Sequence, residues 1–214
     1  ATRRGVVKKT ELAAYANPRA GGIIGLTLDE GDELIAVRLI SGRDEVFLAT
    51  RQGMAIRFAE DEVRSIGRAG RGVIGIDLED GDGVVAAEVV RPGTTILTVN
   101  ERGYGKRTEL EEYRLQGRGG RGIINVRVTE KNGPVVGILQ VQEQDQVMMI
   151  SQEGKVTRLP VREISVIGRA TQGVRLQGLE ASDRVAAVTS LVAEESEGEA
   201  GSGAGGPETD AAEE

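Results

Sequence analysis

Thr50-Arg51-Gln52-Gly53 is one of four copies of a short phrase that recurs at intervals of 48 to 51 residues. Each copy ends in a glycine, and a basic residue follows four positions later. A second glycine stands 17 to 19 residues after the first and leads into an apolar run. Short apolar runs separated by Gly, Asp and Asn turns, with a period near 50 residues, are typical of blades arranged around an axis. The other copies of the phrase are Thr2-Arg3-Arg4-Gly5, Asn100-Glu101-Arg102-Gly103 and Ser151-Gln152-Glu153-Gly154.

The repeat predicts an all-β, propeller-like fold built of units of about 50 residues. Aromatic residues make up only 2% of the chain, so the core must consist of Val, Ile, Leu and Ala. Helical turns are expected only within 59–65 and 160–166. A strand precedes Gly53 but is cut short before Gly5, so we expect a piece of a longer protein with further repeats upstream. The four predicted blades are 1–49, 50–99, 100–150 and 151–192.

The composition excludes several kinds of site. The chain has no cysteine and no histidine, which removes disulfides, thiolate zinc sites, thiol nucleophiles and Ser-His-Asp triads. The acidic turns Asp29-Glu30-Gly31-Asp32 and Glu79-Asp80-Gly81-Asp82 lack the ligand spacing of an EF-hand, so we predict solvated turns and no metal site. No P-loop is present. With neither an apolar run long enough to span a membrane nor a signal peptide, a cytoplasmic location is expected.

The last 22 residues, 193–214, differ in composition from the rest of the chain. They hold eight acidic residues and no basic residue. Of the 27 basic and 34 acidic residues of the chain, residues 1–192 therefore contain 27 and 26. Gly, Ala, Ser and acids without apolar periodicity predict a disordered acidic tail. The tail is either a solubilising terminus or an intramolecular competitor of the phosphates of a polyanionic ligand. Deleting it without changing the affinity for that ligand at low salt would exclude the competitor.

A glycine-rich basic loop precedes the second glycine of the third repeat. Its glycines let the backbone approach a phosphate chain, and its guanidiniums suit phosphate oxygens. Every repeat offers arginine in the same slot, so a ring of blades would carry positive loops along one rim. Duplex DNA bent through backbone contacts is the polyanion that fits such a rim. The predicted loop comprises Gln116, Gly117, Arg118, Gly119, Gly120, Arg121 and Gly122, and the slot in the other repeats supplies Arg19, Arg68, Arg71 and Arg169.

A second set of basic residues follows the first glycine of each repeat. Neighbouring side chains of a strand point to opposite faces, so we expect about half of this set to contact phosphate. The basic residues of this second set are Lys8, Lys9, Arg57, Lys106, Arg107 and Arg158.

The tyrosines raise the question of a covalent DNA-cleaving nucleophile. Tyr15 and Tyr113 share one repeat position, and Tyr104 occupies the position that Val6 holds in the first repeat, so packing is predicted for all three.

Residues 1 to about 191 resemble the C-terminal domain of bacterial DNA gyrase A. The resemblance rests on the runs 5–10 and 103–108, the phrase 168–176 and the loop 116–122. The family's signature heptad is Gln-Arg-Arg-Gly-Gly-Lys-Gly. Five positions match here, Arg121 replaces Lys and Gly117 replaces Arg. Whether this box is the principal copy or a second one stays open.

The resemblance implies a β-pinwheel, usually of six blades, that wraps duplex DNA around its rim and supports ATP-dependent negative supercoiling. It also implies an upstream cleavage domain carrying the catalytic tyrosine and a gyrase B subunit, in an A2B2 holoenzyme associated with the nucleoid. No cofactor is expected in this piece, since ATP and Mg²⁺ would bind elsewhere. The alternatives are the matching domain of topoisomerase IV, which generally has a degraded box, and a propeller-like scaffold that binds proteins.

Overall fold

The structure is a computed structural model that describes residues 1–191, and the predicted tail lies outside these residues. The described chain consists of strands, short 3-10 helices and turns, which confirms the all-β prediction. Two of the 3-10 helices fall within 59–65 and 160–166, where helical turns were expected. The 3-10 helices are η1 (Leu12–Tyr15), η2 (Glu60–Glu62), η3 (Leu110–Glu112) and η4 (Val161–Glu163).

Three β-hairpins organise the fold, and each turns at a copy of the repeated phrase. The first strand of each hairpin also pairs with a strand from later in the chain, so it lies in the middle of its sheet. The hairpins are β2 (Glu45–Thr50) with β3 (Met54–Ala59), β6 (Thr95–Asn100) with β7 (Tyr104–Glu109), and β10 (Gln146–Ser151) with β11 (Val156–Pro160). Their added strands are β5 (Val84–Val89), β9 (Val135–Val141) and β13 (Val185–Leu191).

A two-residue strand from each following repeat completes the preceding sheet. These strands are β4 (Val73–Ile74), which pairs with β1 (Val6–Val7), β8 (Ile123–Ile124), which pairs with β3, and β12 (Val174–Arg175), which pairs with β7. Each of these sheets therefore contains strands from two successive repeats. The predicted blade boundaries divide the sequence and do not coincide with the sheets. Successive units interlock through this exchange.

The glycine that ends the repeated phrase in each of the first three repeats allows the next unit to approach the turn. Gly53 has φ 87°, and a Cβ there would lie 2.3 Å from the Val126 carbonyl oxygen. The amide of Asn125 donates to the Gly53 oxygen over 2.8 Å. The same contact recurs one unit later, where the Leu176 amide donates to Gly103. A turn and an inter-unit contact therefore both require glycine at this position.

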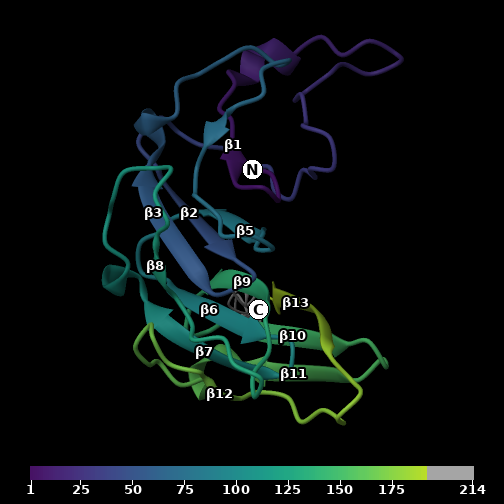
Figure 1. The fold of residues 1–214 in the computed structure, drawn as a ribbon, viewed down its shortest axis with the longest axis vertical. Coiled ribbons are helices and arrows are strands. Elements are labelled where there is room, and N and C mark those ends of the chain that lie inside the picture. The colour runs from purple at the N-terminus through teal and green to yellow at the C-terminus, as the bar shows by residue number, and fades with distance from the viewer. Residues whose placement is uncertain (192–214) are drawn as a thin grey trace, which may run out of the picture.

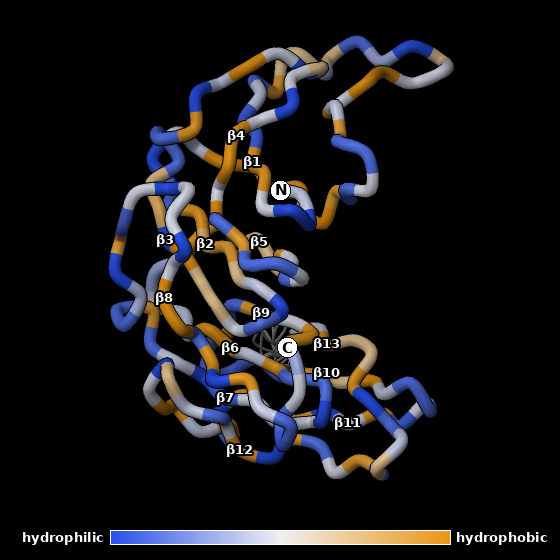
Figure 2. The backbone as a smooth tube through the Cα atoms, in the orientation of Figure 1, coloured by the Kyte–Doolittle hydropathy of each residue, from blue (hydrophilic) through white to orange (hydrophobic). Residues whose placement is uncertain are grey.

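The cores lie between successive sheets. One cluster joins Phe47 and Ala55 of β2 and β3 to Ile96 of β6 and to Tyr113, whose ring meets that of Phe47 edge to face at 5.0 Å. Tyr113 is 1% exposed, which confirms its predicted packing role. The expectation of a core made only of Val, Ile, Leu and Ala is wrong, because Phe47, Phe58 and Tyr113 are all buried in it. Figure 2 shows that hydrophobic segments follow the strands, whereas long hydrophilic stretches lie in the connecting loops.

The sheets follow one another along a curved array with β1 at one end and β11 and β12 at the other (Figure 1). Residues of β5, β9 and β13, together with residues 35–38, line a shared cavity of about 240 Å³. These strands form the inner side of the array. The strands β4, β8 and β12 form the opposite, outer edge of their sheets.

Candidate nucleic-acid interface: the basic rim

Three of the four loops in the predicted slot lie at the outer edge of the array. Loops 67–72, 116–122 and 168–173 lead directly into β4, β8 and β12, which are the outermost strands of their sheets. Loop 17–22 precedes the corresponding residues of the first repeat. We call these four segments the rim loops. The structure thus brings loops 67–72, 116–122 and 168–173 to one side.

The backbone of the rim loop 116–122 is fastened to the preceding unit. The amide of Gln116 donates to the Arg57 oxygen, that of Gly119 donates to the Gly75 oxygen over 2.7 Å, and the Gly120 oxygen accepts from the amide of Asp77. Because the Gln116 and Gly119 amides donate inside the protein, they do not form a phosphate cradle in this structure.

One arginine in three of the four rim loops serves as a clip between units. Arg118 donates through Nη1 to the Ile74 oxygen over 3.1 Å and through Nε to the Glu62 oxygen over 2.9 Å. Arg68 donates in the same way to Ile24, and Arg169 to Ile124, each over 2.8 Å. These three side chains are half-buried. Their position in the repeat is thus explained by stacking of the units, and the structure does not show that they contact DNA.

The arginine just before the second glycine lies in solvent instead. Arg121 lies 3.4 Å from Glu79 and 3.8 Å from Asp77, with 71% of its side chain exposed. Arg71 pairs similarly with Asp29 over 3.3 Å. Arg19 is exposed as well. Ion pairs this exposed contribute little stability, so a phosphate can displace the carboxylate at small cost.

Most basic residues of the second predicted set point inward. Lys106 is fully buried and donates to the Thr108 hydroxyl and to the carbonyl oxygens of Gly168 and Arg169. Burial lowers the pKa of Lys106 to about 8. Lys8 makes the corresponding contacts to the carbonyl oxygens of Gly25 and Arg68. Both lysines hold a rim loop of the next unit in place.

The residues four positions after the first glycine fasten the next 3-10 helix. Lys9 donates to the Glu60 oxygen, Arg57 to the Leu110 oxygen, and Arg107 to the Ile164 oxygen. Arg107 is 4% exposed. Arg158 is exposed and donates to Gln146. We therefore leave Lys106 and Arg107 out of the proposed interface, because their side chains do not reach solvent.

Two exposed arginines outside the two predicted sets lie beside the rim loops. Arg64 and Arg114 follow the buried residues Val63 and Tyr113, between the 3-10 helix and the rim loop of their unit. Within residues 1–191 neither guanidinium has a hydrogen-bond or ion-pair partner. Both stand eleven residues after the glycine of the repeated phrase, so a position-by-position alignment of the repeats would have found them.

The aspartates of the acidic turns have a structural role. The Asp32 carboxylate accepts from the amides of Arg4 and Glu33, and that of Asp82 accepts from the amides of Gln52 and Gly83. Burial raises the pKa of Asp32, but hydrogen bonds from Thr2, Arg4 and Glu33 outweigh it and the pKa is lowered. Within residues 1–191 no cluster of acidic residues suitable for a metal ion is found.

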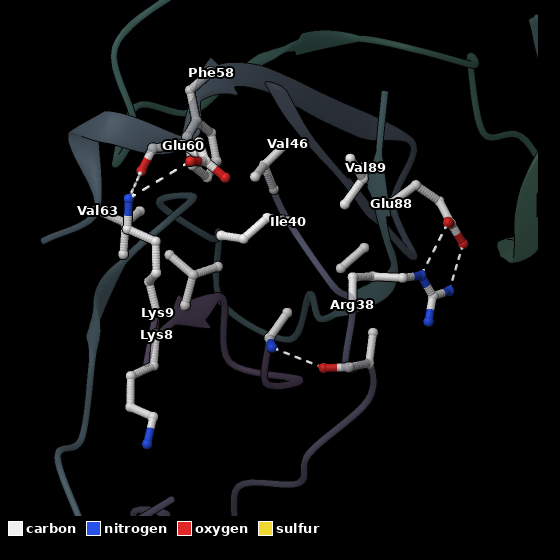
Figure 3. A pocket seen from close by; sticks show the side chains of 14 residues that line it. Lys8, Lys9, Arg38, Ile40, Val46, Phe58, Glu60, Val63, Glu88 and Val89 are labelled. Atoms are coloured by element: carbon white, nitrogen blue, oxygen red, sulfur yellow. Dashed lines mark hydrogen bonds and ion pairs between the residues drawn. The ribbon is translucent and has the colours of Figure 1, made fainter. Parts of the chain in front are cut away.

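A cavity of about 90 Å³ separates the first repeat from the sheet of β2, β3 and β5 (Figure 3). Its apolar lining includes Val46 and Phe58. Lys9 pairs with Glu60 at one end and Arg38 with Glu88 at the other. The cavity lies away from the rim loops, and it therefore adds nothing to the candidate interface.

Residues 1–191 contain no helix with the length and apolar character of a membrane span.

Comparison with known proteins identifies the family. Residues 1–41, 44–91, 94–142 and 145–191 match the family described as DNA gyrase C-terminal domain, beta-propeller. The chain is 57% identical over 196 residues to the DNA gyrase A protein of Halalkalibacterium halodurans, a match that covers 92% of this chain and 24% of the relative.

Two solved structures are similar over 89% of the chain. The C-terminal domain of DNA topoisomerase IV gives a TM-score of 0.84 at 30% identity, with 60% of that chain covered. The DNA gyrase A C-terminal domain gives 0.80 at 26% identity, with 64% of that chain covered. The repeats, the interlocked sheets and these matches agree: the chain belongs to the DNA gyrase C-terminal domain family.

Proposed function

We propose that this chain binds duplex DNA along its rim loops and bends it without reading its sequence. The observation that carries the proposal is the recurrence of exposed guanidiniums at equivalent places on one curved edge. Contacts to phosphates fix the position of a duplex but carry no sequence information. A duplex that follows successive contacts along a curved edge must bend.

Counterion release drives this binding. Each phosphate neutralised by an arginine frees condensed cations, so affinity falls steeply with salt. Arg19, Arg64 and Arg114 offer exposed charge directly, whereas Arg71 and Arg121 must first leave their carboxylates. The clips Arg68, Arg118 and Arg169 act indirectly, since they hold successive rim loops in register for the duplex.

The chain spans about a quarter of the length of the curated relatives it matches, so the activity of the whole protein is part of the proposal. In our account the piece is non-catalytic and supports negative supercoiling by a gyrase A2B2 holoenzyme in the bacterial cytoplasm, at the nucleoid. The cleavage domain of gyrase A and the gyrase B protein would be its partners, with ATP and Mg²⁺ bound elsewhere in that assembly.

The topoisomerase IV alternative is supported by the TM-score of 0.84 to that domain. The 57% identity to a gyrase A protein and the nearly complete heptad favour gyrase.

The test is binding of a 40-base-pair duplex by the 214-residue chain across a salt series. We expect a log–log slope of about −5, or about six phosphate contacts at about −0.9 each. Arg71→Gln with Arg121→Gln should make the slope less steep by about 2. Glutamine is compatible with this position because Gln172 occupies it in the fourth repeat.

The control is Arg3→Gln, which removes one exposed charge in the repeated phrase of the first unit, outside the rim loops. It should leave the slope unchanged. Weak binding that is alike in all variants would contradict the proposal and favour a protein-binding scaffold.

A further inference from the structure

We call the pairing of β4 with β1, of β8 with β3 and of β12 with β7 the first, second and third junctions between units. The third junction differs from the other two. The cross-strand pair at the outer edge is Val6 with Ile74 in the first junction and Met54 with Ile124 in the second. In the third junction it is Tyr104 with Arg175. An apolar pair is thus replaced by an aromatic ring and a cation at the same place on the rim.

A second cation reaches the same ring. Arg175 donates through Nη2 to the Tyr104 hydroxyl over 3.2 Å, and its Cζ lies 5.6 Å from the ring centroid. Lys131 Nζ lies 5.3 Å from that centroid. The hydrogen bond from Arg175, with the charges of Arg175 and Lys131, lowers the pKa of Tyr104 against the opposing effect of burial. The ring therefore sits in a positive environment.

The turn that carries Lys131 is held in place. Asn132 is fully buried, and its amide donates to the oxygens of Arg127 and of Gln172 in the next unit. Its own oxygen accepts from the amide and the hydroxyl of Thr129. Positions equivalent to Lys131 are Gly31 and Gly81, so this unit alone of the first three presents a base here. A fixed turn lowers the entropy cost of ordering a ligand beside it.

The two cations lack an anionic partner. Within residues 1–191 neither Arg175 nor Lys131 takes part in an ion pair. Glu101, a nearby acid, is already bridged by Arg51 and Arg184 over 3.7 and 3.6 Å. Two positive groups beside one ring repel each other, and an anion bound near them would relieve the repulsion.

We propose that Tyr104, Lys131 and Arg175 form an anchoring site for a phosphate of the DNA backbone. Arg175 occupies the position of Ile74 and Ile124, whose carbonyl oxygens receive the rim-loop clips, so the site lies on the rim. The guanidinium is oriented by the tyrosine hydroxyl and keeps further donors for a phosphate oxygen. This inference rests on the proposed function. It places a strong contact with the DNA backbone at the third junction.

The experiment uses substitutions that the repeats themselves supply. Arg175→Ile installs the residue found in the two earlier junctions, and Lys131→Gly installs that of the first two turns. In the salt series with the 40-base-pair duplex, each should make the slope less steep by about 1, and the double variant by about 2. Arg3→Gln again controls for loss of a charge, and thermal unfolding midpoints should stay at that of the unchanged chain.

A slope equal to that of the unchanged chain in the double variant would overturn this inference. If Arg71→Gln with Arg121→Gln still reduced the slope, the proposed function would stand. Absence of duplex binding by the unchanged chain would overturn both.

The guanidinium resonance of Arg175 in ¹H–¹⁵N NMR spectra, assigned by its loss in Arg175→Ile, gives a direct readout. It should shift when the duplex is added. Equal saturation by inorganic phosphate, at the concentration of phosphate groups in the duplex, would make this a free-anion site and overturn the assignment to DNA.

Discussion

Gly122→Ala is expected to destabilise the chain by about 2 to 5 kcal/mol, because the residue is restricted both by its own backbone and by the neighbouring unit. Its φ is 75°, and a Cβ would lie 2.2 Å from the Ala55 oxygen and 2.8 Å from the Ala55 carbon. Those atoms belong to β3, whose pairing with β8 joins the two units. The methyl group must push the sheets apart.

The matched control is Gly22→Ala at the same position of the first repeat. Gly22 has φ 78°, but nothing lies within 4 Å of the place that a methyl group would take there. It should therefore show only the backbone term of about 1 to 2 kcal/mol. Urea unfolding followed by circular dichroism measures both variants. Equal losses would show that the close approach of the units does not contribute.

Lys106→Met should change how stability depends on pH, because the lysine is buried with a pKa of about 8. An unfolded lysine has a pKa near 10.4, so between these values the unfolded chain holds a proton that the folded chain has released. Stability from this group therefore rises with pH across the window and is lost as pH falls. The unfolding free energy of the unchanged chain, minus that of the variant, should grow by about 2 kcal/mol from pH 7.5 to 10.

Lys155→Met controls for the loss of an exposed lysine, and urea unfolding at each pH supplies the free energies. A difference that shrinks as pH rises would be incompatible with our account. It would mean that the ammonium form of Lys106 is the one that stabilises the junction with Gly168 and Arg169.

The repeat pattern predicted the all-β class and the positions of the hairpin turns, because glycine spacing and apolar runs are local signals. It did not predict the exchange of short strands. Met54 pairs with Ile124, which lies more than one repeat later in the sequence. An apolar segment of only two residues does not indicate which strand it pairs with or in which register. The interlock was therefore visible only in the structure.

The pattern also could not separate structural from exposed basic residues. Arg118 and Arg121 share one loop, yet the first is held by the Ile74 oxygen and the second lies in solvent. Arg107 and Arg158 share one repeat position, yet only Arg107 is covered by a following 3-10 helix, near Ile164. Burial here depends on the neighbouring unit, which no single repeat encodes.

The most direct test of the account is whether the chain changes the path of DNA. A singly nicked plasmid is incubated with increasing amounts of the 214-residue chain, closed with ligase, freed of protein and resolved by linking number. We predict a distribution displaced from that of the protein-free plasmid in proportion to the chain bound, with the sign of the shift giving the hand of the wrap. An unchanged distribution at saturating binding would contradict the claim that the rim curves DNA.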